Sequence, residues 1–510
     1  MTWSTTFCAV SASPELRDRV RAAAAVARRA AGLPEAGLGS LIREPRRLGF
    51  NDGTIRPPSS FPPGTSRRTI RNAAADRSPL RGAVRVVVVL IDFPDKSFGE
   101  QPSRFQDLFF STGVVSTGSV TEYYRDVTGG LVEITGEVVG PLTMPQPLSW
   151  YANGNFGIGN PSGEPRANIM AQDAVKAADP VVNLKPYDND GDGYVDAFVI
   201  VHAGRGGEET GDSGDIWSHK WVLPEEYDAD GTQVYGYLTI PEDAKLGVSA
   251  HELGHLLFGF PDLYDTDYTS EGIGDWCLMA GGSWNGGGDT PAHPSAWCKV
   301  QQGWVQVENV TADGTVDLPD VKRSRTVHRM WTSGQPGSEY FLLENRQQDG
   351  YDAAIPGSGL LVWHVDEAQE GNTDENHYLV GLLQADGLRE LELDTSRGDG
   401  GDPYPGWHDN TQLTGSTNPS SQSHAGQDTG VVVADISASG DPMQATLSVT
   451  GTVPRPDKGG EGGDLEQLRA AVTALQAQVA TLQRAVNDAG AALSATAGDG
   501  VRRWSRRSIG

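Results

Sequence analysis

The stretch Val84-Arg85-Val86-Val87-Val88-Val89-Leu90-Ile91 decides the fold class. It is a short, mostly β-branched apolar run, which is typical of a strand buried on both faces of a sheet. Residues 168–178 have a helical pattern, and Ala197 to His202 form a second candidate buried strand. Helices that alternate with buried strands predict an α/β layer that extends to about residue 305.

Beyond Asn309 the pattern changes to short alternating strands separated by turn signals. This pattern predicts an all-β, sandwich-like region over 310–452 that packs on the α/β layer. The expected strands are Glu339–Glu344, Gly359–Val365, Val431–Ile436 and Gln444–Val449.

A linker rich in Pro, Gly and charged residues follows at 453–463. Apolar residues then recur at spacings of 4, 3, 4, 3 and 4, namely Leu468, Val472, Leu475, Val479, Leu482 and Val486. This heptad predicts a coiled coil over 464–497 and therefore a homo-oligomer, with a helix that packs on its own domain as the alternative. Residues 498–510 form a basic tail.

The N-terminal 83 residues form a basic leader. Residues 1–85 hold 15 Arg and 6 acidic residues, a charge balance of +9. Since the whole chain has a net charge of −27, residues 86–510 carry −36. Ser13-Pro14 starts a helix that Gly32 ends, and the composition of 33–82 predicts a weakly ordered connector. The leader is a candidate propeptide that docks on the acidic body by charge, and a solvated Arg-rich segment is the alternative.

Composition excludes two classes of protein. A net charge of −27 with a pI near 4.7 excludes a generic nucleic-acid binder, which needs a basic face to neutralise phosphates. The longest apolar run is far shorter than the ~20 residues of a membrane span, so no transmembrane segment is predicted. Met1 to Val10 has no basic n-region and no long apolar h-region, so no secretory signal is predicted.

Three cysteines in 510 residues do not make a disulfide framework. Cys277 and Cys298 are candidates for a single bridge, and buried thiols are the alternative. Cys8, in the leader, is a candidate zinc ligand that would hold an enzyme latent, because thiolates bind Zn²⁺ readily.

The sharpest motif is His251-Glu252-Leu253-Gly254-His255. Two His at i and i+4 lie on one face of a helix, so both imidazoles can bind one Zn²⁺, and Glu252 is placed to act as general base on water. The alternative is a chance match on an ordinary helix.

The residues after this motif suggest how the site is completed. Gly259 suits a left-handed helix end, and Asp262 is the best candidate for the third zinc ligand, with Asp265 and Glu271 as alternatives. Met279 lies in a Gly-rich turn that is expected to form the floor of the site. Tyr264 and Tyr268 are candidate donors to an oxyanion, while His219 and His364 are explained at least as well by structural roles.

A second cluster predicts a calcium loop. Asp188, Asp190, Asp192 and Asp196 stand at positions 1, 3, 5 and 9 of a loop with Gly193 at position 6, and Tyr194 offers a backbone carbonyl at position 7. Position 12 is Val199, so a full EF-hand is not expected. A solvated acidic turn is the alternative.

The chain resembles the immune inhibitor A type of secreted bacterial metallopeptidases, which are metzincin-like zinc endopeptidases. The resemblance covers roughly residues 84–450. It rests on the H-E-x-x-H motif, the Met279 turn and the stretches Leu90–Asp95, Tyr123–Val127, Ile216–Trp221, Pro261–Asp265, Phe341–Arg346 and Gly359–Glu367. Gly259 and Asp262 each lie one residue farther from His255 than the family's H-E-x-x-H-x-x-G-x-x-D pattern places them.

The resemblance implies a zincin-like catalytic domain of mixed α and β structure at 84–309, zinc-dependent cleavage of peptide bonds in proteins, and a stabilising calcium. It also implies secretion, with a cytoplasmic location or non-classical export as the alternative. The competing function is a non-catalytic binding protein, oligomerised by its coiled coil, that keeps a structural metal site. A metal enzyme of another class is a third possibility.

Overall fold

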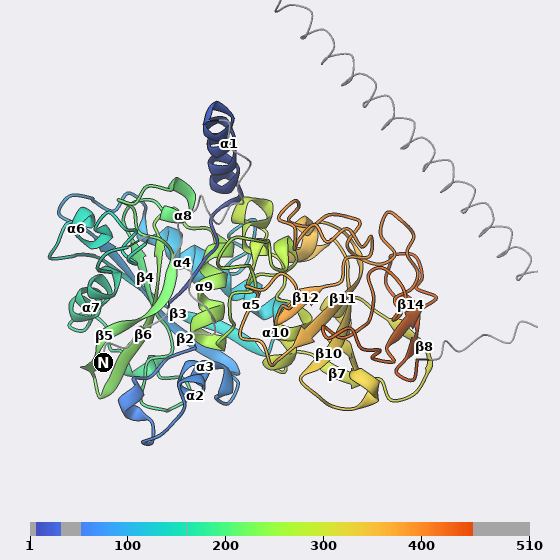
Figure 1. Cartoon of the computed structure of the whole chain (residues 1–510). Coiled ribbons are helices and arrows are strands. Elements are labelled where there is room, and N and C mark those ends of the chain that lie inside the picture. Colours follow the sequence, from blue (N-terminus) through green and yellow to red (C-terminus); the bar gives the residue numbers. More distant parts are fainter. Residues whose placement is uncertain (1–6, 32–52, 161, 452–510) are drawn as a thin grey trace, which may run out of the picture. The chain divides into compact units, whose positions relative to one another are not determined.

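The computed structural model describes residues 7–31, 53–160 and 162–451 (Figure 1). The predicted linker, coiled coil and basic tail at 453–510 lie outside the described residues. None of the described helices is long and apolar enough to cross a membrane.

A six-stranded sheet with the order β1-β5-β6-β4-β2-β3 forms the centre of the N-terminal half. β2 runs parallel to β3 and β4, β4 runs parallel to β6, and β5 returns antiparallel to β6. Two of these strands confirm the buried runs predicted from the sequence. The bounds are β1 Cys8–Ala9, β2 Gly82–Asp92, β3 Val132–Thr143, β4 Phe198–His202, β5 His219–Ala229 and β6 Thr232–Pro241.

Helices cover both faces of this sheet. The connections from β2 to β3 and from β3 to β4 step across the sheet in opposite directions, so right-handed crossovers place their helices on opposite faces. α9 (Leu246–Phe258) contacts α5, β5 and β6, and Figure 1 shows α7 on the other side of the sheet. The remaining helices of this half are α4 Pro102–Phe110, α5 Val120–Val127, α6 Leu148–Ala152, α7 Ala167–Ala178, α8 Gly207–Thr210 and α10 Ala296–Gln301, with short 3₁₀ turns η3 Lys185–Tyr187, η4 Gly274–Trp276 and η5 Gly281–Gly288.

The predicted all-β region is confirmed as two sheets with the orders β12-β11-β10-β9-β7 and β13-β14-β8. Side chains alternate along the central strands, so Leu342 and Trp363 pack into the α/β core while Phe341 and Val362 face Leu447 of the second sheet. The bounds are β7 Gln306–Asn309, β8 Gly314–Leu318, β9 Thr326–Trp331, β10 Glu339–Arg346, β11 Gly359–Asp366, β12 Val380–Leu382, β13 Val432–Ala434 and β14 Met443–Ser448, with α11 Val321–Ser324 and the 3₁₀ turns η6 Thr332–Gly334 and η7 Gly350–Ala354.

The leader is only partly as predicted. The helix that starts at Ser13-Pro14 is confirmed as α1 (Pro14–Ala31), and the Ser13 hydroxyl accepts the N–H of Leu16. The expectation of a weakly ordered connector is wrong for residues 53–82. Ile55, Ala74 and Leu80 are buried in the core of the α/β layer, and Phe61 packs partly buried against it, so a few apolar residues anchor this polar segment. The helical pieces here are η2 Pro58–Ser60, α2 Arg67–Arg71 and α3 Ala73–Asp76.

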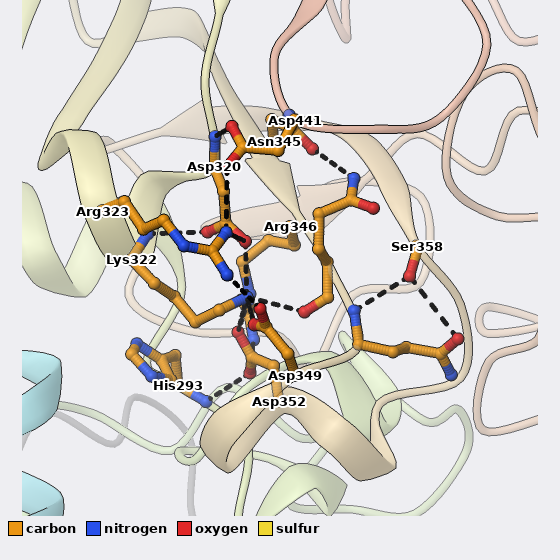
Figure 2. A network of polar contacts seen from close by, with 12 residues as sticks. His293, Asp320, Lys322, Arg323, Asn345, Arg346, Asp349, Asp352, Ser358 and Asp441 are labelled. Carbon is orange, nitrogen blue, oxygen red and sulfur yellow. Dashed lines mark hydrogen bonds and ion pairs between the residues drawn. The ribbon is translucent and has the colours of Figure 1, made fainter.

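A buried ion network joins the α/β layer to the β region (Figure 2). The Arg346 guanidinium on β10 is fully buried and donates to both carboxylate oxygens of Asp352. Asp352 also accepts the N–H of His293, and Arg346 donates to the carbonyl of Trp276 at 3.3 Å. Burial alone would raise the pKa of Asp352, but the charge of Arg346 holds it below its ordinary value. The network therefore ties β10 to the turn that precedes Met279.

Candidate active site and metal centre

The helix α9 carries the H-E-x-x-H motif, and all 13 of its residues are buried. It ends at Gly259, whose φ of 66° is left-handed as predicted, and the N–H groups of Gly259 and Phe260 donate to the carbonyls of His255 and Gly254. A side chain at Gly259 would meet the backbone of Ala75 at 2.4 Å. Glycine is therefore required here both for the helix end and for the close approach of the leader.

Hydrogen bonds fix the tautomers of the two histidines. The Nδ1 atom of His251 lies 2.9 Å from the Leu278 carbonyl, and that of His255 lies 2.6 Å from the Phe260 carbonyl. Because a carbonyl only accepts, each Nδ1 carries the proton and each Nε2 presents a lone pair. The two Nε2 atoms are 3.0 Å apart, and burial lowers the pKa of His255, which favours its neutral form.

Asp262 completes this group. Its Oδ1 atom lies 3.2 Å from both Nε2 atoms, its side chain is buried, and Oδ1 has no hydrogen-bond partner among the described residues. The alternatives serve other roles: Asp265 accepts the hydroxyls of Thr269 and Ser270, and Glu271 pairs with leader arginines. Two imidazole nitrogens and one carboxylate oxygen that converge without protons between them fit a divalent cation such as Zn²⁺. The extra residue before Asp262 is absorbed, since α9 stays helical through Phe258 and turns at Gly259.

Glu252 lies within the same buried region. Its Oε1 accepts the N–H of Val10 at 2.9 Å, and its Oε2 is buried without a partner among the described residues. Burial, and then the nearby charge of Asp262, raise the pKa of Glu252 well above its ordinary value. A buried carboxylate with an unused oxygen is suited to exchange protons with a small molecule in the site.

The turn that contains Met279 packs against α9. A Cβ atom at Gly254 would meet the Met279 sulfur at 2.8 Å, so the turn packs directly on the motif helix. Its backbone binds both sides of the site, because the Leu278 carbonyl accepts from His251 and the Met279 carbonyl accepts the N–H of Leu263. The turn thereby orients the first histidine and the loop that carries Asp262.

Leader residues 8–13 pass directly through this site. β1 adds to the edge of the sheet antiparallel to β5, with Cys8 opposite Lys220 and Ala9 opposite His219. Four side chains then bind the leader's backbone: the Tyr264 hydroxyl donates to Ala9 O at 2.7 Å, the indole N–H groups of Trp217 and Trp284 donate to Val10 O and Ser11 O at 2.8 and 3.0 Å, and the Tyr268 hydroxyl accepts from Ala12 N at 2.9 Å. No local sequence pattern indicates the roles of Trp217 and Trp284, since both indoles bind a segment more than 200 residues away.

Residues 80–310 match the family model described as the immune inhibitor A peptidase M6, catalytic domain. This segment is therefore similar to the catalytic domain of the immune inhibitor A peptidases. The match confirms the resemblance predicted from the sequence.

Two kinds of curated relative are similar to this chain. The "pre-pro-metalloprotease PrtV" of Vibrio cholerae is 31% identical over 331 residues, which cover 53% of this chain and 35% of the relative. The "Immune inhibitor A" of Bacillus thuringiensis subsp. alesti is 36% identical over 233 residues, which cover 38% of this chain and 32% of the relative. The chain thus spans about one third of the length of the curated relatives it matches.

The predicted calcium loop folds around its own carboxylates. Asp188 accepts the N–H groups of Gly191 and Gly193, and one oxygen from each of Asp188, Asp190 and Asp196 falls within 4.8 Å of the others. The loop leads into strand β4 rather than a helix, which agrees with the missing position-12 carboxylate. The leader's Arg77 donates to both Asp190 and Asp196, so a guanidinium supplies positive charge here.

The remaining candidate residues lie outside the group formed by His251, His255 and Asp262. His219 is buried in the core between the Trp217 carbonyl and the Tyr237 hydroxyl, and burial lowers its pKa to about 4. His364 contacts Glu339 in the β region at 2.9 Å. The three cysteines are not joined in disulfides, and buried Cys277 and Cys298 interact as thiols.

Proposed function

We propose that the chain is a zinc endopeptidase that hydrolyses peptide bonds in proteins. The observation that carries the proposal is the convergence of His251 Nε2, His255 Nε2 and Asp262 Oδ1. In the same buried region, Glu252 Oε2 has no hydrogen-bond partner among the described residues. His251, His255 and Asp262 would hold the zinc. When bound there, zinc acidifies a water molecule and polarises the scissile carbonyl.

Glu252 is the proposed general base. Its carboxylate takes a proton from the attacking water and then gives it to the leaving amine, so one group serves both halves of the reaction. The histidines contribute by holding their Nε2 lone pairs in place through the bonds from Nδ1 to backbone carbonyls, which fixes their orientation.

The proposed substrate groove is the path that leader residues 8–13 follow. An extended peptide that adds to the exposed edge of β5 gains backbone hydrogen bonds that do not depend on its sequence. Tyr264 donates to a carbonyl in this groove, which supports it over Tyr268 as a donor to the developing oxyanion, because Tyr268 accepts there instead.

The leader is proposed to be a propeptide and the chain an exported proenzyme. Two observations support this: leader residues occupy the groove, and leader arginines pair with acidic residues of the body, such as Arg17 with Glu271 and Arg77 with Asp196. The name of the Vibrio relative, a pre-pro-metalloprotease, is consistent with such an arrangement. The coiled coil predicted at 464–497 stays a prediction of oligomerisation.

A protein-hydrolysis assay tests the function. A recognition sequence for a specific protease is inserted into residues 33–51 and cut, and the N-terminal fragment with β1 and α1 is removed at high salt, which screens its ion pairs. The chain that remains keeps residues 53–83 and is called leader-free because the groove segment 8–13 is gone. We expect the remaining chain to hydrolyse casein, to lose this activity with a metal chelator, and to regain it with Zn²⁺. Absence of hydrolysis at full zinc occupancy would favour the binding-protein alternative.

Calcium is proposed to bind the loop at Asp188, Asp190, Asp192, Asp196 and the Tyr194 carbonyl, where it would stabilise the fold. A ligand present at 100 times its Kd stabilises a folded protein by about 2.7 kcal/mol, so Ca²⁺ is expected to raise the melting temperature. Asp188→Asn should abolish the rise, because it removes one charge from the loop while leaving the zinc residues in place. A melting temperature that Ca²⁺ does not change would exclude this site.

A further inference from the structure

We propose that Cys8 is a fourth zinc ligand and that its sulfur keeps the proposed peptidase latent. This inference rests on the proposed zinc site and concerns its regulation. The Cys8 sulfur, a ring nitrogen of His255 and a carboxylate oxygen of Asp262 all lie within 4.8 Å of one another. Cys8 is 1% exposed, so the thiol is enclosed in the site rather than presented to solvent.

The chemistry of the group suits a thiolate. Two imidazoles and one carboxylate leave one position of a tetrahedral zinc site open, and a thiolate is among the strongest zinc ligands in proteins. Metal binding would replace the S–H bond of Cys8 with a metal–sulfur bond and release the proton to the buffer, and the sulfur would take the position that the attacking water needs.

The leader's backbone blocks the other catalytic group. The N–H of Val10, two residues after Cys8, donates to Glu252 Oε1. In the same segment, Trp217, Trp284 and Tyr264 bind three successive carbonyls. One short peptide thus covers the metal position, the general base and the groove together, which a loosely associated leader would not do.

The helix that follows anchors this segment. Arg17 is 3% exposed and pairs with Glu271 at 2.5 Å, while Arg21 pairs with Asp394 at 2.5 Å. On the opposite side, Arg19 donates to the Glu209 carbonyl at 2.6 Å. These contacts hold α1 beside the groove and keep the Cys8 sulfur at a high effective concentration near the metal.

Cobalt substitution of the intact, uncut chain tests the ligand without relying on activity. A thiolate bound to Co²⁺ gives an intense charge-transfer absorption in the near ultraviolet, whereas nitrogen and oxygen ligands do not. We expect the band in the wild-type chain and in the Cys298→Ser control, and its loss in Cys8→Ser and Cys8→Ala. A wild-type chain without the band, or a band that survives both Cys8 substitutions, would overturn the inference.

Activity gives the second readout. The uncut Cys8→Ser chain should hydrolyse casein at least about tenfold faster than the uncut wild type, since a loss of only 1.4 kcal/mol from the blocked state is a factor of ten. Equal rates would contradict the latency role. If instead the cut, leader-free chain is inactive with zinc bound, the proposed peptidase function fails, while the cobalt band still reports whether Cys8 binds the metal.

Discussion

Glu252→Gln is expected to lower casein hydrolysis by the leader-free chain by about 10²–10⁴-fold, the range typical of a lost general base. The amide keeps the size of the side chain and, in the uncut chain, an oxygen that can accept the Val10 N–H. It cannot take a proton from water, so the loss should appear in kcat with little change in KM.

Zinc content separates this mechanism from a general disruption of the site. Glu252→Gln should retain one zinc per chain, because Glu252 is not among the three groups that converge. Asp262→Ala removes one of those groups, and we expect its zinc affinity to fall by at least about 100-fold, more than the 10–100-fold typical of losing an outer-shell partner. A Glu252→Gln chain that hydrolyses casein at the wild-type rate would rule out the proposed role of Glu252.

Asp352→Ala is expected to destabilise the protein by about 3–5 kcal/mol, because it removes the carboxylate that accepts two hydrogen bonds from the fully buried Arg346. Among the described residues, Arg346 would keep only its 3.4 Å ion pair with Glu344, which Lys299 also shares. Since Arg346 also binds the Trp276 carbonyl, the loss should loosen the turn before Met279. Chemical denaturation followed by tryptophan fluorescence measures the effect.

Asp349→Ala is the matched control. Asp349 lies three residues before Asp352 and pairs with Lys322 and Arg323, but its side chain is 42% exposed. Exposed ion pairs contribute about 0–1 kcal/mol, so this variant should unfold close to the wild type. Equal destabilisation by the two substitutions would show that burial does not set the strength of this network.

The strands and helices with a strong local pattern could be predicted from sequence alone. The valine-rich run at 84–91 and the alternating strands near 340 and 360 lie where their periodicity placed them. The prediction of a weakly ordered connector is wrong for residues 53–82. Pro, Arg and Gly dominate the composition of this segment, but a few of its apolar residues pack against distant strands. Local composition does not report such tertiary contacts.

The metal site could be predicted only in part, because local spacing determines where the two histidines lie but not where the third ligand lies. A helical spacing of four brings His251 and His255 together whatever the rest of the chain does. Asp262 could only be ranked among three acids, since its position depends on how the turn at Gly259 absorbs an extra residue. The groove contacts of Trp217, Trp284 and Tyr264 join residues more than 200 positions apart, and no local pattern encodes them.

The most direct test of the central claim is casein hydrolysis by the leader-free chain while zinc is titrated into the chelated protein. The zinc endopeptidase account predicts activity that rises with zinc and reaches its plateau at one zinc per chain, with Glu252→Gln binding the same zinc and remaining inactive. Hydrolysis that persists in the chelated protein, or a fully zinc-loaded chain that hydrolyses nothing, would contradict it.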